Sequence, residues 1–304
     1  MNRNKNKKNL ERLPLRSRGA SSNHRFGGLD VVILIMLILY VIIVVFPFYN
    51  AFVISISSEN AYFNSDLLLW PQDITFEAYK AVFTNSAMWK GFGITMILLI
   101  LGTAYQLFFT VITGYALSRD KWAGKNFVMN MIIVTMFFGG GLVPYYYLIV
   151  SLGLYDSIWV MIIPGAIDTF NMLLMRNYFA SLPKELEESA KIDGANDIQI
   201  FVKVYLPLSL PMLATIGLFF AVGNWNSWYN AMLFIKNQDY KPLQLVLREM
   251  IASISSSIES PTTNTYSESL IMASIFFTIV PMMCFYPFLQ RFFVKGIVVG
   301  AIKG

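Results

Sequence analysis

Long apolar stretches separated by shorter polar segments form the main pattern along this chain. Hydropathy marks six of them, at residues 31–54, 92–117, 127–151, 157–179, 206–235 and 269–290. Each is long enough to cross about 30 Å of hydrocarbon as a helix, which satisfies its own backbone hydrogen bonds there. No alternating strand pattern competes with this interpretation. The sequence therefore predicts an all-α polytopic protein with six transmembrane helices.

The composition agrees with a chain that lies mostly in lipid. Hydrophobic residues make up 56% of the 304 residues and charged residues only 13%, against about 25% charged in soluble domains. The single cysteine, Cys284, excludes an internal disulfide and a cysteine-based metal site. The first apolar stretch is too long for the core of a signal peptide, so we expect it to remain as a transmembrane helix.

Positive charge is distributed unevenly around the predicted helices. If both termini are cytoplasmic, 18 of the 23 Lys and Arg residues lie inside. The five outside are Lys80, Lys90, Lys236, Lys241 and Arg248. This bias predicts that both termini are cytoplasmic. Residues 1–28 then form a basic tail near anionic lipid, residues 291–304 a second cytoplasmic tail, and residues 29–290 the membrane domain; we expect no nucleic-acid partner.

Two longer loops are predicted on the outer side. Residues 55–91 contain Trp70, Phe76, Tyr79 and Phe83, which is enough apolar content for a small packed cap. Residues 236–268 are richer in Ser and Thr, and we expect a mobile projection that can reach a partner outside.

Residues 181–205, on the cytoplasmic side, predict a helix, a bend and a second helix. Ser181 is a candidate N-cap, and the Glu residues that follow lie near the positive end of the helix dipole. Gly194 permits a sharp turn. Asp197 is a candidate cap for the second helix. Four apolar or aromatic residues recur there at helical spacing and are expected to pack against the membrane bundle: Ile198, Phe201, Val202 and Tyr205.

The same segment carries a familiar motif. Glu188-Ser189-Ala190, then Gly194, then Val204-Tyr205-Leu206-Pro207 resembles the EAA motif of permease subunits of bacterial ABC importers. The run from Leu182 to Ala195 is similar to the carbohydrate branch of that family. Trp225-Asn226 and the ending from Gln290 to Gly296 look like the maltose-type second permease. The resemblance covers roughly residues 30–304, and residues 181–205 are called the EAA segment below.

This resemblance implies a type I ABC importer permease in a bacterial cell membrane. A second, homologous permease would complete the pathway, a cytoplasmic ATPase dimer would bind ATP and Mg²⁺, and an extracytoplasmic solute-binding protein would deliver an oligosaccharide. The chain itself has no phosphate-binding loop, since Gly124-Lys125-Asn126 fails that pattern. We therefore expect a pore-forming subunit with no cofactor or metal of its own, which is not an enzyme.

The resemblance also assigns candidate contacts with the ATPase. In the EAA segment they are Glu187, Glu188, Ser189, Ala190, Asp193, Gly194 and Ala195, and in the C-terminal tail Lys295, Gly296 and Lys303. Two alternatives stay open. The segment could be an amphipathic loop in the headgroup region, and the tail could be a frayed terminus.

Polar residues inside the apolar stretches are candidates for contact with substrate. Asp168 falls near the middle of the fourth stretch, a costly place for a carboxylate, and Asn171 follows on the same helical face. Amides, carboxylates and aromatic rings all bind sugars, so the candidate lining is Asp168, Asn171, Asn224, Trp225, Asn226 and Trp228. A bond from Asp168 to a neighbouring helix or to the partner permease is the alternative.

Glycine-rich sequence interrupts the third stretch. Gly139-Gly140-Gly141 with Pro144 predicts a broken helix, either as a hinge for alternating access or for close helix packing. Other functions fit less well. A secondary transporter would be expected to show repeats and several membrane carboxylates, and a membrane enzyme finds no base beside Cys284, because the only histidine, His24, lies in the tail. An ABC permease for a non-sugar solute stays open.

Overall fold

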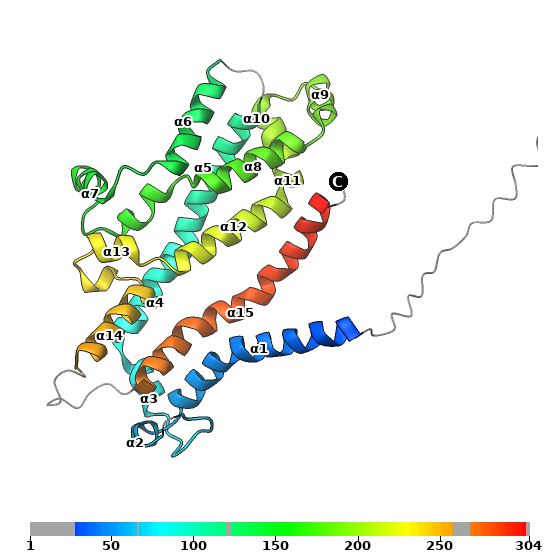
Figure 1. The fold of residues 1–304 in the computed structure, drawn as a ribbon. Coiled ribbons are helices and arrows are strands. Elements are labelled where there is room, and N and C mark those ends of the chain that lie inside the picture. Colours follow the sequence, from blue (N-terminus) through cyan, green and yellow to red (C-terminus); the bar gives the residue numbers. More distant parts are fainter. Residues whose placement is uncertain (1–27, 66, 120–122, 258–267, 302–304) are drawn as a thin grey trace, which may run out of the picture. The chain divides into compact units, whose positions relative to one another are not determined.

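A computed structural model describes residues 28–65, 67–119, 123–257 and 268–301, without the side chains of residues 59, 63, 254–257 and 285–301. Within these ranges the secondary structure is helical and contains no strand. The chain divides into two compact units, Met1–Tyr49 and Asn50–Gly304. The α-helices are α1 Gly28–Ser55, α2 Glu59–Phe63, α3 Glu77–Thr84, α4 Ser86–Ile97, α5 Thr103–Ser118, α6 Lys125–Phe137, α7 Leu142–Ser151, α8 Thr169–Ser181, α9 Lys184–Ile192, α10 Asp197–Ile200, α11 Leu206–Leu208, α12 Leu210–Trp225, α13 Tyr229–Phe234, α14 Leu243–Ser257 and α15 Glu268–Ala301 (Figure 1).

Two of the predicted membrane helices are single continuous rods. α1 contains an 18-residue window with a mean hydropathy of 3.3, as expected of a helix surrounded by lipid or by other membrane helices. The second rod runs Ser86–Ser118 and joins α4 to α5 through a π-helical turn, Leu98–Gly102. It starts six residues before the predicted boundary, at Ser86 rather than residue 92.

Three further membrane segments are bent pairs of helices rather than rods. α6 and α7 meet at 116°, the 3₁₀ turns Ile158–Gly165 meet α8 at 42°, and Asp197–Leu208 meets α12 at 77°. The predicted break in the third stretch is confirmed. Gly141 has a φ of +85°, a conformation that a residue with a Cβ adopts only with strain, so the chain turns sharply there.

Five of the six predicted stretches are thus found, two as rods and three as bent pairs, and the sixth corresponds to the shorter apolar segment Glu268–Cys284 of α15. Some of the boundaries change. The fifth was expected to run to residue 235, but α12 ends at Trp225 and α13 is a separate short helix. The sixth continues beyond residue 290, since α15 extends to Ala301. In the second unit, α5 packs closely along α8. The two helices are so close at Gly114 that a methyl group there would lie only 3.2 Å from Cβ of Met175.

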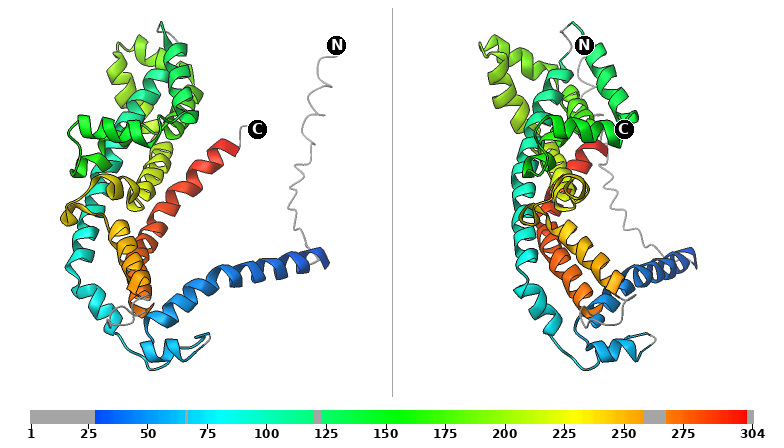
Figure 2. Two further views of the ribbon diagram at one scale, coloured as in Figure 1. Left: turned by 60° about the vertical axis from the view of Figure 1, so that its left-hand side comes forward. Right: turned by 90° about the vertical axis from the view of Figure 1, so that its left-hand side faces the viewer.

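The two long loops differ from their predictions. Loop 55–91 does pack, through Ala61, Leu68 and Val82. Of the four aromatic residues predicted to pack there, Tyr79 does so and the other three are exposed. Loop 236–268 is not wholly a projection, because α14 packs against α4 and α15 (Figure 2). The leucines at 243, 245 and 247 are buried there, and the Ser and Thr content masked this apolar pattern. Residues 258–267 lie outside the described residues.

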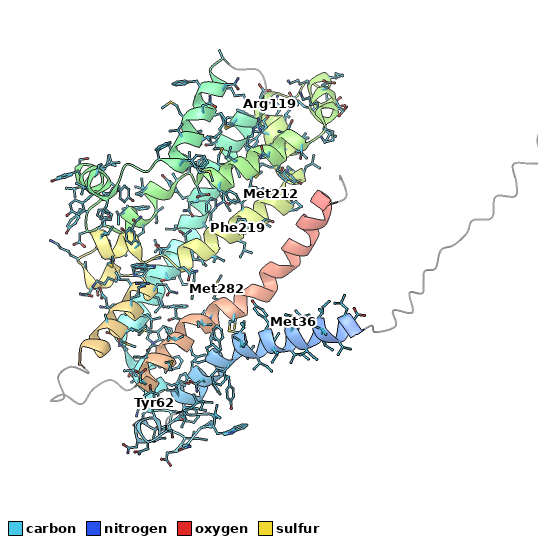
Figure 3. All side chains as sticks on the ribbon, viewed as in Figure 1. Met36, Tyr62, Arg119, Met212, Phe219 and Met282 are labelled. Carbon is cyan, nitrogen blue, oxygen red and sulfur yellow. The ribbon has the colours of Figure 1, made fainter. Side chains whose placement is uncertain are left out.

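Side chains of the second unit gather into separate apolar clusters. One cluster forms the support for the EAA segment and joins Met175 and Phe179 of α8 to Ile200, Tyr205 and Ile216. Figure 3 labels Arg119 at this end of the unit, beside α9 and α10, while Met282 lies on α15 well away from it. The EAA segment therefore rests on a packed base built from α5, α8 and α12.

Candidate coupling site

The first helix of the EAA segment is α9, which follows α8 after a two-residue break (Figure 1). Ser181 was expected to cap it, but this residue is the last of α8, where its hydroxyl donates a hydrogen bond to the carbonyl of Tyr178 at 2.7 Å. Pro183 occupies the N-cap position without a side-chain bond. Glu185 and Glu187 lie in the first turn, as predicted from the helix dipole.

The sharp turn predicted at Gly194 is confirmed. Gly194 has a φ of +82°, and its N–H donates to the carbonyl of Lys191 at 3.0 Å. The N–H of Ala195 donates to the carbonyl of Ala190 at 2.9 Å. These two bonds form a Schellman motif, which satisfies the last carbonyls of α9. The turn therefore fixes the direction of the chain as it leaves the helix.

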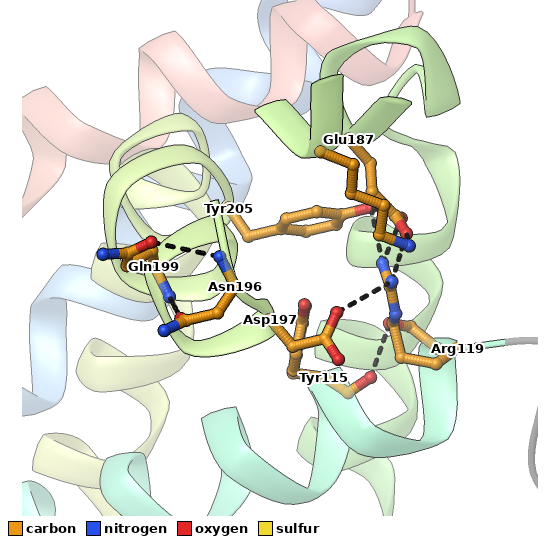
Figure 4. A network of polar contacts seen from close by, with 9 residues as sticks. Tyr115, Arg119, Glu187, Asn196, Asp197, Gln199 and Tyr205 are labelled. Atoms are coloured by element: carbon orange, nitrogen blue, oxygen red, sulfur yellow. Dashed lines mark hydrogen bonds and ion pairs between the residues drawn. The ribbon is translucent and has the colours of Figure 1, made fainter. Parts of the chain in front are cut away.

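The second helix begins one residue earlier than predicted. Asn196, not Asp197, is the N-cap of α10: its side chain accepts from the N–H of Gln199 at 2.8 Å. The Gln199 side chain accepts in turn from the N–H of Asn196 at 3.0 Å (Figure 4). This reciprocal capping box satisfies two backbone donors. Asp197 occupies the first helical position instead.

The face by which this helix packs also differs from the prediction. Of the four residues expected to pack, Phe201 and Tyr205 do so, but Ile198 and Val202 are 74% and 50% exposed. Ile200, which was not predicted, is buried instead. The reason is a π-helical turn, Phe201–Tyr205, whose hydrogen bonds join residues five apart instead of four. Ile200 and Tyr205 are five residues apart and so face the bundle together.

A charged pair anchors α9 to the end of α5. The guanidinium of Arg119, the residue after α5, donates to both carboxylate oxygens of Glu187 (Figure 4). The hydroxyl of Tyr205 donates to Glu187 at 3.2 Å and accepts from Arg119 at 3.3 Å. The Arg119 guanidinium also lies 5.4 Å from the ring centre of Tyr115. Three distant parts of the chain therefore meet at one carboxylate.

The electrostatics of Glu187 follow from these contacts. Partial burial raises its pKa, but the hydrogen bonds from Arg119, Lys191 and Tyr205 outweigh burial and lower the pKa to about 2. Lys191 contributes from the next turn of α9, with its Nζ 2.6 Å from the carboxylate. Glu187 therefore stays ionised at neutral pH, and its side chain is turned inward and only 16% exposed.

The remaining predicted contacts of the EAA segment divide into two groups. Ala190 and Ala195 are half-buried and pack against the apolar cluster beneath. The others are exposed: Glu188, Ser189, Asp193 and Gly194. Two large apolar side chains accompany them, since Ile192 is 87% exposed and Ile198 is 74% exposed. The segment thus has an anchored inner side and an outer surface of mixed polar and apolar character.

The residues proposed to line a substrate pathway lie in different surroundings. Asp168 was expected in the middle of a helix, but it is the exposed N-cap of α8. Its carboxylate accepts a hydrogen bond from the N–H of Asn171 at 2.8 Å. The Asn171 side chain is buried, with its carbonyl oxygen unpartnered among the described residues. Asp168 thus holds a position that costs far less than a carboxylate buried in mid-helix.

The candidate substrate contacts after residue 220 also differ from one another in burial. The buried Asn224 amide donates to Thr103 at 3.1 Å and to Gln106 at 2.9 Å, so it ties α12 to α5. Trp225 is 2% exposed. Asn226 is exposed and Trp228 is half-buried, at the start of α13. The six candidates therefore differ in burial and in their partners, and their contact with a substrate stays a prediction.

Sequence reasoning missed several residues of the site. Arg119, Tyr115 and Asn196 were not singled out, although Asn196 with Gln199 has the spacing of a capping box. Arg119 had one signal, a positive charge at the end of a membrane stretch. In the tail, Lys295 and Gly296 lie within α15 but their side chains are outside the described part, and Lys303 lies outside the described residues. Among described residues, no group of three or more His, Cys, Asp or Glu could hold a metal ion.

Curated relatives are similar to most of this chain. No family model matches the chain. It is 38% identical over 268 residues to the protein LplC of Bacillus subtilis, covering 86% of this chain and 90% of LplC. It is 35% identical over 281 residues to the polygalacturonan/rhamnogalacturonan transport system permease protein YtcP of Bacillus subtilis, covering 90% and 98% of the two chains.

A solved structure extends the likeness to three dimensions. A chain from the crystal structure of a bacterial ABC transporter involved in the import of the acidic polysaccharide alginate superposes with a TM-score of 0.81 at 34% identity. The match covers 87% of this chain and 96% of that one. With its bent helical spans and an EAA segment held on a packed base, the chain belongs to the membrane-embedded permease subunits of carbohydrate ABC importers.

Proposed function

We propose that this chain forms half of the translocation pathway of a binding-protein-dependent oligosaccharide importer, and that its EAA segment transmits work from a separate ATPase. A second permease of similar fold completes the pathway. ATP and Mg²⁺ bind in the ATPase dimer, and this subunit supplies no hydrolytic site. Both termini and the EAA segment then lie on the cytoplasmic side of a bacterial cell membrane.

The two-sided character of the EAA segment carries this proposal. Its inner side is held by the bond between Arg119 and Glu187, while Glu188 and Ile192 on its outer surface are exposed. Large apolar side chains that are exposed beside charged ones are typical of a surface that another protein covers. A rigidly anchored surface also transmits displacement, because it moves together with the helices beneath it.

The names of similar proteins favour an oligosaccharide as the transported substrate. YtcP is named for polygalacturonan and rhamnogalacturonan transport, and the similar solved structure for import of a polysaccharide. The permease AraQ of Halalkalibacterium halodurans, 28% identical over 267 residues that cover 86% of this chain and 92% of AraQ, is named for arabinooligosaccharides. A solute-binding protein that delivers such chains to the outer loops fits this group. Lys295, Gly296 and Lys303 stay a prediction as further ATPase contacts.

Substitutions on the outer surface of the EAA segment test the proposal. In the complete importer, Glu188→Lys and Ile192→Asp are expected to reduce copurification of the ATPase and ATP-dependent oligosaccharide uptake by at least about tenfold, as for loss of a central interface residue. Both side chains are exposed, so each variant should insert and fold like the wild type.

A matched control makes the same substitution as Ile192→Asp at an exposed isoleucine outside the EAA segment. Ile74 is 64% exposed in loop 55–91, and Ile74→Asp is expected to leave ATPase association intact. If Glu188→Lys and Ile192→Asp both keep normal ATPase binding and uptake, the EAA segment is not the coupling surface. If the wild-type complex transports no oligosaccharide at all, the proposed function itself is wrong.

A further inference from the structure

A cavity lies at the end of α12, at some distance from the EAA segment. It has a volume of about 440 Å³ and is bounded by α12, α14 and α15. Most of its wall is apolar and comes from Ile and Met residues of α15. Three polar side chains face it, Asn226, Gln244 and Thr278. This volume and mixture resemble small-molecule pockets, which span about 300–1,000 Å³ and place a few polar groups in an apolar wall.

The polar side chains of this cavity have unused hydrogen-bonding capacity. The Gln244 amide makes no hydrogen bond within the described part of the chain, so both its oxygen and its nitrogen are available. The Asn226 nitrogen donates to the carbonyl of Val222 at 2.9 Å, which leaves the amide oxygen free to accept. Donors and acceptors of this kind pair with sugar hydroxyl groups.

Close in sequence to the residues of this cavity, a cation lies over an aromatic ring. The guanidinium carbon of Arg248 is 3.6 Å from the ring centre of Trp228. Neither residue lines the cavity itself, but Arg248 follows Gln244 by one helical turn on α14 and Trp228 follows Asn226 by two residues, so each is next to a lining residue along the chain. Stacking covers one face of the guanidinium and restricts this long side chain, while the N–H groups at its edge remain available.

No carboxylate of the described chain neutralises this arginine. The adjacent Glu249 is held by Lys241 instead, whose Nζ lies 2.6 and 2.8 Å from its two carboxylate oxygens. Among the described residues Arg248 forms no ion pair. Its charge is therefore available, in a fixed orientation, to a carboxylate brought by another molecule. A planar guanidinium binds a carboxylate through two parallel hydrogen bonds.

We propose that Arg248 and Trp228 form, with Asn226 and Gln244 of the adjoining cavity, a binding site for the uronate unit of an acidic oligosaccharide. The carboxylate of the sugar pairs with the edge of the guanidinium, and its hydroxyl groups pair with the two amides. This inference rests on the proposed function and narrows it from oligosaccharides in general to those that carry carboxylates.

Equilibrium binding to the purified importer, without its solute-binding protein, tests this site directly. The probes are labelled trigalacturonate and trimannuronate, each compared with its fully methyl-esterified form, which keeps the sugar units but lacks the charge. The wild type is expected to bind at least one acid about tenfold more tightly than its ester, as for loss of a charged hydrogen bond. Arg248→Gln should remove this preference, and Arg248→Lys should restore only part of it.

Lys236→Gln is the matched control, because Lys236 is also a cation over a ring, 5.3 Å from the centre of Tyr155, but no residue that lines the cavity lies within about one helical turn of it along the chain. It should keep the preference for the acid. The site is refuted if the wild type binds neither probe, binds acid and ester equally, or keeps its preference in Arg248→Gln. A variant that loses only its association with the solute-binding protein would assign Arg248 to protein docking, which also overturns the proposal. If the site is refuted but the importer still takes up neutral oligosaccharides, the proposed importer function remains supported.

Discussion

The carboxylate of Glu187 in α9 receives both hydrogen bonds of the Arg119 guanidinium at the end of α5. The two residues are 68 positions apart in the chain. Their bond connects the first helix of the EAA segment directly to the long helix Ser86–Ser118, beside the covalent connection through α8. A displacement of α9 therefore reaches two membrane helices, α5 and α8.

Removing one partner of this pair should loosen the EAA segment. Arg119→Ala leaves Glu187 partly buried without its main partner. Loss of a fully buried pair member costs about 3–5 kcal/mol, and we expect about 1–3 kcal/mol here because both side chains retain some exposure. Thermal unfolding of the detergent-solubilised protein measures the change, and limited proteolysis reports exposure of α9.

Lys191→Ala provides the comparison for this experiment. It removes only the exposed pair within α9, for which about 0.5 kcal/mol is expected. Equal stability of Arg119→Ala and Lys191→Ala would mean that the bond between Arg119 and Glu187 does not anchor the helix.

The lowered pKa of Glu187 predicts a specific pH dependence. The ionised form is favoured in the folded protein, with a pKa of about 2 against 4.5 for the free side chain. The stabilisation is therefore complete above about pH 4.5 and is lost as the pH falls towards 2. Melting temperatures of the wild type and Glu187→Gln should differ most near neutral pH and converge in acid. A difference that stays constant over this range would contradict the assignment.

Gly194 offers a test that separates backbone strain from steric bulk. A Cβ at this position would meet no atom within 4 Å, so the φ of +82° is the constraint. Gly194→Val should strain the turn by about 1–2 kcal/mol and reduce coupled ATPase activity, whereas Gly194→Asn should retain most of it, because Asn tolerates the left-handed conformation. Similar losses in both variants would indicate that the ATPase requires a bare backbone there.

Asp168 can be assigned to helix capping or to substrate binding with two substitutions. Asp168→Ala removes the acceptor for the Asn171 N–H and should destabilise the protein by about 1 kcal/mol, while Asp168→Asn keeps an acceptor oxygen. If the residue only caps α8, uptake by Asp168→Asn matches the wild type. If it binds sugar through its charge, this variant raises the KM for uptake while its melting temperature is unchanged.

Local signals in the sequence were sufficient for much of the fold. Apolar stretches long enough to cross a membrane located the spans, and the glycines before Pro144 located the sharpest bend, since both depend only on neighbouring residues. The turn at Gly194 was predictable for the same reason. The packed helix α14 was missed because its Ser-rich end and the following polar residues masked the leucines at its start.

Contacts between distant residues could not be predicted in this way. Nothing near Arg119 indicates that it meets Glu187, because their approach depends on how α5 and α8 pack. The burial of Ile200 instead of Ile198 depends on a π-helical turn, which a search at the ordinary helical period does not detect. Asp168 was placed in mid-helix because hydropathy does not distinguish the 3₁₀ turns before it from a continuous helix.

The π-helical turn Phe201–Tyr205 also limits how the chain can change in length. Deleting one residue there would restore ordinary hydrogen bonding, but it would rotate every preceding residue of the helix by about 100° around its axis. Ile200 would leave the interior, and α9 would present a different side to the ATPase that we propose binds it. Under the proposed function, deletion of one residue from this turn would therefore change the register between α9 and the membrane helices, which a substitution of similar size would leave in place.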